Sequence, residues 1–349
     1  MLLAQKALTD FGQEADARTA PLSDARTSVT AVIVNFNGGK HLRACLQSLS
    51  AQSRPLRKVL IVDNASTDGS LDGIERDARC QILRLGKNIG FAAACNFAAA
   101  LTDDSRWLLV LNPDAELEPD WLEKMMSAAR QRPNVAAFAG RLLSFHQRDV
   151  LDGAGDVLHV SGAHWRRGHG RRANGRFVAD EEVFSACAAA ALYRRDVFLK
   201  AGGFDESFFC YGEDIDLGFR LRLMGERCRY VPDAVARHVG SASCGKNSDF
   251  VVYHGHRNLV WLYLKNMPGP LLLLYLPQHL VWNLVTIIWF TLRGQGGPIL
   301  RAKWDALRRL PQILRERRDI QSRRKVRFRE LWRAMDRGLL TPYLRRGTR

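Results

Sequence analysis

The sequence predicts an α/β fold around a mostly parallel central sheet, and two observations lead to this expectation. Strand-like and helix-like patterns alternate from residue 29 to about residue 112, as they do in consecutive βαβ units. The first run, VTAVIVN over residues 29–35, is continuously apolar and β-branched, which is typical of a strand buried on both faces. Ligands of such sheets bind beyond the carboxyl ends of the strands, so the residues that follow each strand are candidates for a binding site.

Seven elements are expected in the alternating part. They are strands over residues 29–35, 58–63, 81–86 and 107–112, and helices over residues 41–52, 70–78 and 91–102. Residues 141–180 are rich in Gly, Arg and His and predict a loop or hairpin region over the site. Strand and helix patterns return between residues 183 and 240, and from Tyr253 the sequence changes to long apolar and then basic helices.

Composition and charge narrow the function classes. The seven cysteines are scattered without a C-x-x-C pair, which argues against a disulfide framework or a cysteine zinc site and favours a reducing compartment. Residues 1–28 form a polar lead-in without the apolar core of a secretory signal. The formal charge of +16 is uneven, because residues 293–349 hold 18 Lys and Arg against 5 Asp and Glu, or +13. Such a basic end predicts an anionic partner, either nucleic acid or a membrane surface.

A dense group of carboxylates follows the strand expected over residues 107–112. Asp120 and Glu123 fit an acidic variant of the capping box and are expected to be structural. Glu116 and Glu118 are expected to be solvated loop charges. Asp114 follows the strand directly beside Pro113, and a hard divalent cation binds one or two such carboxylates together with substrate phosphates.

Polar residues also follow the other expected strands. Asp63 ends the second strand, where a carboxylate can accept hydrogen bonds from a nucleobase or ribose, whereas Asp68 is expected to cap the helix that follows. Glu213 and Asp214 stand at the first turn of a helix that is expected to stop at Gly225. Their position is compatible with simple helix-dipole electrostatics, but the neighbouring aromatic residues favour a partly enclosed site. Neither G-x-G-x-x-G nor G-x-x-x-x-G-K-[ST] occurs.

Taken in order, these segments resemble family 2 glycosyltransferases of the GT-A fold, and in particular the bacterial rhamnosyltransferase-like branch that builds surface polysaccharides. The resemblance runs from residue 29 to about residue 243. It is carried by VTAVIVNFNG, VDNASTDGS, NIGFAAACN, LNPDAEL, GGFDESFFCYGEDIDLGFR and the downstream His238. It implies a Rossmann-like nucleotide-sugar-binding domain and an inverting transfer of a sugar, with rhamnose as one candidate.

The resemblance also implies roles for particular residues. Asp214 is the expected general base, with Glu213 as the next candidate, and Asp114 and His238 are expected to bind a divalent cation, Mg²⁺ or Mn²⁺. Asn112 stands where the family has the first Asp of its D-x-D motif, so the sequence departs from the pattern there. The residues expected to bind the donor are Asn35, Asp63, Asn64, Asn88, Gly90, Phe91, Asn96 and Asn112.

The C-terminal part is expected to bind the cytoplasmic face of the inner membrane without crossing it. Residues 268–292 contain no Asp, Glu, Lys or Arg and are long enough to span, but Pro277, His279 and Asn283 lie near the centre, where polar groups are costly. A single crossing would also place the basic end opposite the catalytic domain, against the positive-inside tendency. Residues 299–315 show a basic amphipathic pattern suited to anionic lipids. A helical bundle packed on the catalytic domain, with a solvated basic face, is the alternative.

The sequence thus predicts a lead-in (1–28), a GT-A catalytic domain (29–252) and a helical, basic, membrane-associating region (253–349). The expected partners are a nucleotide diphosphate sugar, a saccharide or lipid-linked saccharide acceptor and an anionic membrane surface, without nucleic acid. A polyprenyl-phosphate sugar transferase stays open as an alternative, and a nucleic-acid-binding protein that uses the basic tail is the rival from another class. A processive synthase would need several membrane spans and a Q-x-x-R-W motif, and the sequence has neither.

Overall fold

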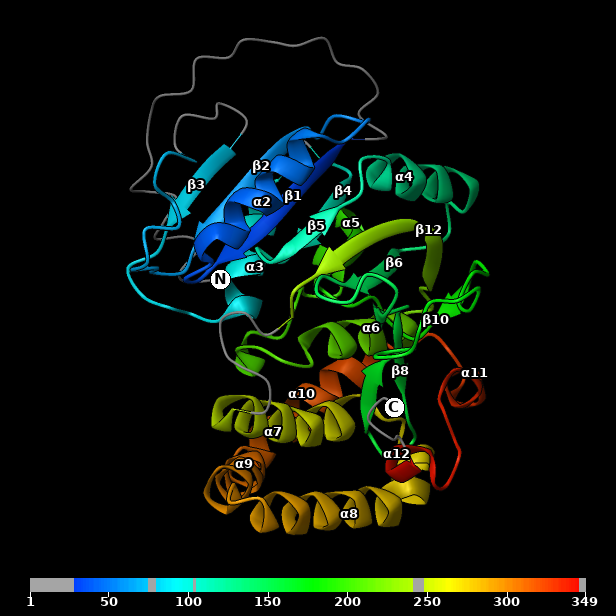
Figure 1. Cartoon of the computed structure of the whole chain (residues 1–349). Coiled ribbons are helices and arrows are strands. Elements are labelled where there is room, and N and C mark those ends of the chain that lie inside the picture. The colour runs from blue at the N-terminus through cyan, green and yellow to red at the C-terminus, as the bar shows by residue number, and fades with distance from the viewer. Residues whose placement is uncertain (1–27, 75–79, 103–104, 241–247, 345–349) are drawn as a thin grey trace.

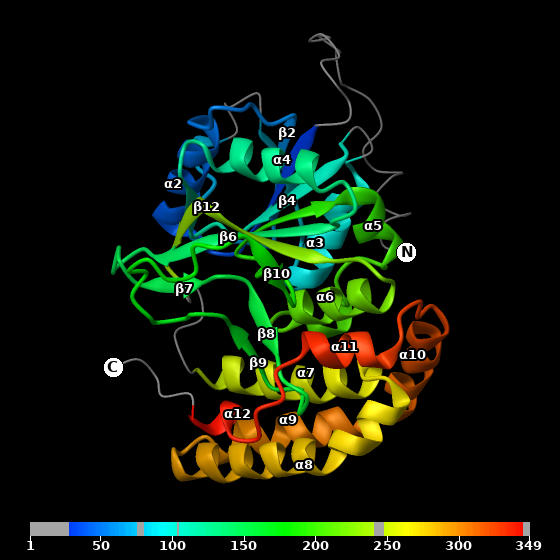
Figure 2. The ribbon, with the colours of Figure 1, turned by 90° about the vertical axis from the view of Figure 1, so that its right-hand side faces the viewer.

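A computed structural model describes residues 28–74, 80–102, 105–240 and 248–344. The predicted lead-in, apart from Ser28, lies outside the described residues. Figure 1 shows a sheet with helices on both faces in the upper part of the molecule and a layer of helices below it. Figure 2, turned by 90°, shows the same two levels, with α8 (Gly269–Leu292) at the base.

The described residues form one large mixed sheet and one small hairpin. The strands are β1 (Val29–Asn35), β2 (Lys58–Asp63), β3 (Cys80–Arg84), β4 (Trp107–Leu111), β5 (Ala115–Leu117), β6 (Ala137–Ser144), β7 (Leu151–Gly153), β8 (Asp156–Leu158), β9 (His164–Arg166), β10 (Glu181–Val183), β11 (Ala190–Arg194) and β12 (Cys228–His238). The large sheet runs in the order β10-β12-β6-β11-β4-β1-β2-β3, with β5 on β12 and β7 on β6. The half from β4 to β3 is entirely parallel, and β12 is parallel to β6. The mostly parallel α/β sheet predicted from the sequence is therefore confirmed.

Helices cover both faces of the sheet. Alternate residues of β1 point into two separate cores, one shared with α2 and α4 and the other with α3, α5 and α6. The other helices form the lower layer in Figures 1 and 2. The bounds are α2 (Gly39–Ser50), α3 (Phe91–Ala100), α4 (Trp121–Gln131), α5 (Arg195–Lys200), the short 3₁₀ helix η3 (Glu206–Phe208), α6 (Glu213–Leu223), α7 (Asp249–Asn266), α9 (Gly296–Arg308), α10 (Leu310–Ser322), α11 (Phe328–Ala334) and α12 (Thr341–Leu344).

Two local predictions are wrong. The helix expected over residues 70–78 is a series of turns in its described part, residues 70–74, because Gly69 and Gly73 adopt positive φ angles of 70° and 78° that interrupt a right-handed helix. The capping box at the start of α4 is absent as well. Asp120 occupies the N-cap position, but its carboxylate pairs with Lys124 at 2.7 Å, and Glu123 pairs with Arg54 and Arg130.

The lower layer packs directly on the sheet domain. A third core joins α6 to α7, α9, α10 and α11 and includes Phe219, Trp261 and Tyr263. The predicted boundary between residues 252 and 253 falls inside α7, which begins at Asp249. The division into a catalytic domain and a membrane-associating region therefore stays a prediction.

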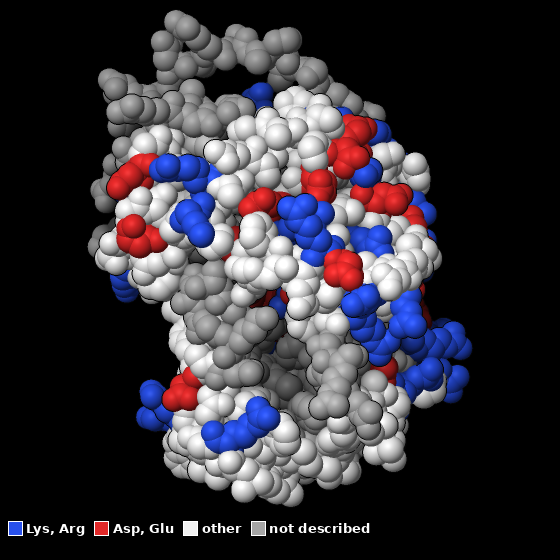
Figure 3. Space-filling view, in the orientation of Figure 1, with Lys and Arg blue, Asp and Glu red and all other residues white. Residues whose placement is uncertain are grey.

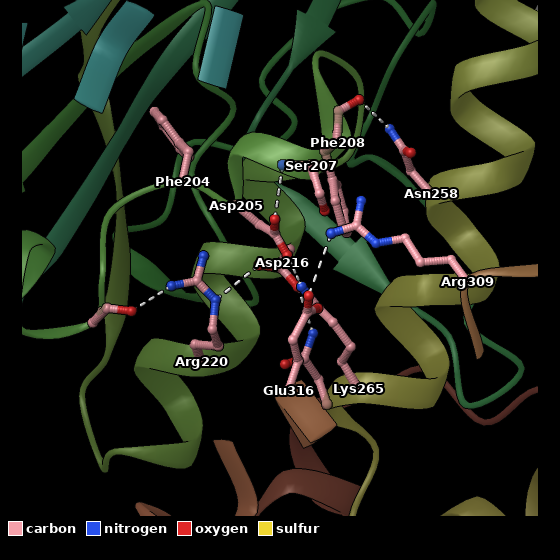
Figure 4. A network of polar contacts seen from close by, with 12 residues as sticks. Phe204, Asp205, Ser207, Phe208, Asp216, Arg220, Asn258, Lys265, Arg309 and Glu316 are labelled. Atoms are coloured by element: carbon pink, nitrogen blue, oxygen red, sulfur yellow. Dashed lines mark hydrogen bonds and ion pairs between the residues drawn. The ribbon is translucent and has the colours of Figure 1, made fainter. Parts of the chain in front are cut away.

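A buried polar network fastens α7 to α6, and Figure 4 shows it at close range. Lys265 of α7, 1% exposed, forms ion pairs with Asp205 and with Asp216 of α6. Asp216 also accepts hydrogen bonds from Arg220 Nε at 2.8 Å and from Asn266 Nδ2 at 2.7 Å. Because each buried charge has an opposite partner, this network holds the two layers in one arrangement.

Three polar residues near the middle of α8 face the protein, and most of the apolar residues of this helix from Leu280 onward are exposed. The His279 ring stacks on Tyr263 with centroids 3.9 Å apart, and its Nδ1 lies 2.7 Å from the Ser161 carbonyl oxygen. Asn283 and Thr286 are buried on the same face. Among the described helices, α8 alone is long and apolar enough to cross a membrane by length and composition. The base of the molecule in Figure 3, where α8 lies, is almost free of charged side chains. The exposed residues are Leu273, Leu274, Leu280, Val281, Leu284, Val285, Ile288, Trp289 and Leu292.

Candidate active site

The candidate site lies where β1, β2 and β4 end and where β12 and the start of α6 meet them. Parallel pairing aligns Asn35 at the end of β1 with Asp63 at the end of β2. Both side chains are buried, at 0% and 4% exposure. The Asn35 amide donates to Asp63 Oδ1 at 3.3 Å and to Ser70 Oγ at 2.9 Å, so Asn35 positions the loop that follows β2.

Asp68 does not cap the helix that was expected to follow it. Asp68 Oδ1 accepts from the backbone N–H of Ser70 at 3.0 Å, within a turn and not a helix. Its Oδ2 accepts from the N–H of Gly39 at 2.8 Å, at the first residue of α2. Asp68 therefore joins the loop after β2 to the start of the helix after β1, and these backbone and side-chain hydrogen bonds outweigh burial and lower its pKa.

A chain of amide hydrogen bonds shapes the loop before α3. Asn64 Nδ2 donates to Asn88 Oδ1 at 2.8 Å, and Asn64 Oδ1 accepts from the N–H of Ile89 at 2.9 Å. Gly90 has φ of 87°, and a Cβ there would lie 2.6 Å from the ring and 2.7 Å from the carbonyl oxygen of Phe209. Only glycine permits this approach, which places the loop before α3 against the segment that leads to α6.

Two further residues predicted to bind the donor make contacts within the protein. Phe91 packs its ring on Phe204 with centroids 5.9 Å apart. Asn96 donates to the carbonyl oxygen of Phe204 and accepts from its N–H, both at 2.8 Å. The structure therefore uses Asn96 to hold the segment before η3, and direct donor contacts by these residues stay predictions.

His238, at the end of β12, lies between two carboxylates. Its Nε2 is 3.3 Å from Asp114 Oδ1, and its Nδ1 is 2.7 Å from Asp152 Oδ2. Burial alone would lower the pKa of His238, but the two carboxylates raise it to about 9. For Asp114 the directions are reversed. Burial alone would raise its pKa, but the contact with His238 and the hydrogen bond from the N–H of Gly240 lower it.

Asn112 joins this group through its side-chain amide, which lies 3.4 Å from His238 Nε2. The structure thus brings together the three residues expected around the cation, Asn112, Asp114 and His238. In the part of the chain that the structure describes, no three His, Cys, Asp or Glu side chains are arranged as a ready metal site. Any cation here would need oxygen ligands from the substrate as well.

The two catalytic candidates on α6 differ in their surroundings. Glu213 is 6% exposed, and its Oε2 has no hydrogen-bond partner among the described residues. Burial and the nearby charge of Asp214 raise the pKa of Glu213 well above its ordinary value. Asp214 is less buried, and its Oδ2 accepts from the N–H of Ala188 at 3.2 Å. Asp214 is the more accessible of the two, and its role as the base stays a prediction.

Sequence reasoning missed three residues beside this site. Asp152 and Arg166 form an ion pair, with Asp152 also bonded to His238. Asp156, on β8, is 3% exposed, and burial together with the charge of Asp214 raises its pKa. All three lie within residues 141–180, predicted as a loop or hairpin region over the site, which β8 and β9 confirm. The D-G-A-G-D spacing of the two aspartates was the available signal.

These features define a nucleotide-dependent transferase domain, with polar groups at the carboxyl edge of a parallel sheet and a carboxylate at an adjacent helix start. Residues 30–202 match glycosyl transferase family 2, and the chain belongs to that family. It is a nucleotide-sugar-dependent glycosyltransferase, which confirms the resemblance seen in the sequence.

Relatives and solved structures agree with this assignment. N-acetylglucosaminyl-diphospho-decaprenol L-rhamnosyltransferase of Mycobacterium tuberculosis (strain CDC 1551 / Oshkosh) is 29% identical over 286 residues, 75% of this chain and 88% of that protein. O-antigen biosynthesis protein RfbC of Myxococcus xanthus is 32% identical over 237 residues, 64% of this chain and 18% of that protein. The crystal structure of GalNAc-T7 with UDP, GalNAc and Mn²⁺ matches with a TM-score of 0.58 at 14% identity, covering 70% of this chain and 48% of that chain. This last likeness concerns the fold, which is of the GT-A type.

Proposed function

We propose that this protein transfers a sugar, with inversion, from a nucleotide diphosphate sugar to a lipid-linked saccharide during surface polysaccharide biosynthesis. The proposal is supported by the Asp114–His238 pair, and by Asp214, which accepts from the N–H of Ala188 beside the Ala189 carbonyl that bonds to Asn112. Asp63 ends the neighbouring strand β2. Rhamnose is the proposed sugar and a diphosphate-linked saccharide the proposed acceptor, because the M. tuberculosis relative carries these names.

The residues around His238 fit a divalent cation, Mg²⁺ or Mn²⁺. Asp114 offers carboxylate oxygen atoms and His238 offers Nε2, a donor set suited to such an ion when substrate phosphates supply the other ligands. Asp152 bonds to Nδ1, which leaves Nε2 as the ligand nitrogen once its proton is lost. When bound, the ion would neutralise the charge that grows on the leaving diphosphate.

Asp214 is proposed to take the proton of the acceptor hydroxyl as that hydroxyl attacks the anomeric carbon. Hydrogen bonds from Ala188 and Ile215 to its two oxygens hold the carboxylate in one orientation. A single base on the face opposite the leaving group implies inversion. Glu213 is only 6% exposed, so an acceptor hydroxyl reaches it less readily than it reaches Asp214.

The lower layer is proposed to bind the cytoplasmic face of the inner membrane with α8 lying in the membrane plane. Because His279, Asn283 and Thr286 are all packed on the protein, one side of α8 is occupied along its length. A helix that crossed the bilayer would have to leave these contacts and expose their polar atoms to hydrocarbon. The outward apolar side chains instead suit the boundary between headgroups and acyl chains.

A transfer assay with the full chain tests the proposal. Nucleotide diphosphate sugars, including the rhamnose donor, are incubated with Mg²⁺ or Mn²⁺ and polyprenyl-diphosphate N-acetylglucosamine, and the product's anomeric configuration is read by NMR. Rhamnosylated lipid of inverted configuration is expected. Glycosylation of plain polyprenyl phosphate instead would identify the alternative, a polyprenyl-phosphate sugar transferase. Transfer from no nucleotide sugar to either lipid would contradict the proposed function.

A further inference from the structure

An open surface cavity, separate from the residues of the active site, lies between α7, the end of α9 and the start of α10. Its volume is about 470 Å³. It is lined by Arg257, Trp261, Asp305, Arg308, Arg309, Pro311, Gln312 and Arg315. Four of these side chains are arginines, so the cavity is suited to bind an anion.

The inner wall of the cavity is rigid. Arg257 and Arg309 hold their guanidinium groups 4.3 Å and 4.9 Å from the ring centre of Trp261, whose Nε1 donates to the carbonyl oxygen of Ala306 at 3.2 Å. Arg257 is 9% exposed and donates to the carbonyl oxygen of Phe208 at 3.0 Å. Two positive charges are therefore fixed in place before any ligand arrives.

The positive charge of the cavity is only partly compensated. Asp305 accepts from the Tyr253 hydroxyl at 2.7 Å. Glu316 lies 3.3 Å from Arg309 Nη2, and both residues appear in Figure 4. Arginines thus outnumber carboxylates four to two. Arg309 Nε is buried without a hydrogen-bond partner among the described residues. Arg308 and Arg315, at the mouth of the cavity, form no ion pair with the described carboxylates. A phosphate oxygen would satisfy these donors.

Exposed apolar side chains lie on the same two helices, α9 and α10, as Arg308 and Arg315. Leu307 and Leu314 precede Arg308 and Arg315 in the sequence and are 58% and 43% exposed, and Trp304 is 67% exposed. A free phosphate needs no apolar surroundings, whereas a lipid offers a phosphate and hydrocarbon together. We propose that this cavity binds the phosphate of a membrane lipid. The inference rests on the membrane location proposed above, and not on the sugar, the cation or the base.

Vesicle binding by the full chain tests the inference. The double variant Arg308→Gln/Arg315→Gln removes the two charges at the mouth. The matched control, Arg318→Gln/Arg329→Gln, removes two exposed charges from α10 and α11 that do not line the cavity. Neutral phosphatidylcholine vesicles are compared with vesicles that also contain phosphatidylglycerol, or a small fraction of polyprenyl diphosphate.

The cavity variant should lose on the order of 5-fold in affinity per arginine for phosphate-bearing vesicles, and the control clearly less. Dependence on Arg308 and Arg315 with phosphatidylglycerol would identify bulk phospholipid as the ligand, and dependence with polyprenyl diphosphate alone would identify the acceptor lipid. Equal losses in both variants would overturn the proposal, because they would reflect general charge. Inorganic pyrophosphate is titrated as a soluble ligand. If pyrophosphate binding depends on Arg308 and Arg315 but vesicle binding does not, the ligand of the cavity is a soluble anion and the proposal fails.

Failure of sugar transfer would be recognised separately. Both variants should bind nucleotide diphosphate as the parent protein does, because none of the substituted residues lies at the carboxyl edge of the sheet. If the parent shows no transfer but the arginine-dependent vesicle binding holds, the proposed reaction fails and the lipid site stands.

Discussion

Two places in this protein hold a buried cation between two carboxylates, and they serve different ends. Lys265 lies between Asp205 and Asp216 at the junction of α6 and α7, and His238 lies between Asp114 and Asp152 at the edge of the sheet. Lysine holds a fixed charge there, in a network closed by further hydrogen bonds. Histidine can give up a proton and offer a nitrogen to a metal ion. The same charge pattern therefore stabilises the junction of α6 and α7 in one case and leaves a titratable group at the candidate active site in the other.

The sharpest test of this comparison uses two aspartates of one helix. Asp214→Asn should lower transfer on the order of 10²–10⁴-fold while donor affinity and unfolding midpoint stay nearly unchanged, because a base acts only in the transition state. Asp216→Asn should instead lower stability, since Asp216 faces Lys265 and Arg220. Turnover and urea unfolding of both variants decide it. If Asp214→Asn keeps more than half the activity, the assignment is wrong and Glu213 is next.

The locking network should be costly to open. Lys265→Met leaves Asp205 and Asp216 without their common partner, and removal of one member of a buried ion pair costs about 3–5 kcal/mol. The matched control, Lys124→Met, breaks the exposed pair with Asp120, where about 0–1 kcal/mol is expected. Denaturant unfolding measures both. Similar values for the two variants would show that Lys265 contributes no more than a surface charge.

The edge site should respond to substitution through ligand binding. Asp114→Ala should abolish the part of nucleotide diphosphate affinity that depends on Mg²⁺ or Mn²⁺, because Asn112 alone is a weak replacement for a carboxylate. Asp152→Asn, which alters the support of His238, should cost about 10–100-fold in metal affinity. Calorimetric titration with and without metal gives both numbers. Unchanged affinity in Asp114→Ala would remove it from the metal site.

Acid should weaken the locking network in a defined pH range. Burial would raise the pKa of Asp205, but the charge and hydrogen bond of Lys265 outweigh it and place that pKa below its ordinary value. The stability from this pair is therefore complete above the unfolded pKa, about 3.9, and is lost as pH falls from there toward the folded pKa. The stability difference between the parent and Asp205→Asn should stay constant from pH 7 to about 5 and shrink below about 4. A difference that already shrinks near pH 6 would point to another group.

The strand ends were predictable, but the side chains that residues 141–180 bring to the site were not. Asn35, Asp63 and Asp114 follow apolar runs whose period identifies them as buried strands, so their place at one edge followed from topology. Asp152, Asp156 and Arg166 lie in short strands with no such period, and only tertiary pairing brings Asp152 and Arg166 to His238. The apolar run around Lys265 likewise gave no sign of its carboxylate partners, which come from residues 205 and 216.

Local signals failed where backbone geometry or a competing partner won. Of the helix expected over residues 70–78, only residues 70–74 are described, and they form turns around Gly73, whose φ is positive. The expected capping box does not form, because the carboxylates of Asp120 and Glu123 form ion pairs with Lys124 and Arg130 instead. The roles of the individual site residues stay predictions until the variants above are measured.

The attachment of α8 along the base of the molecule has a consequence for which acceptors can react. Its inner face is shared with Tyr263 and Ser161, so no linker separates it from the sheet domain. On a bilayer, the active site would then sit at one constant height above the lipid surface. The enzyme would act as a molecular ruler that admits only acceptors whose terminal sugar reaches that height, and its encounters with them would be a search in two dimensions.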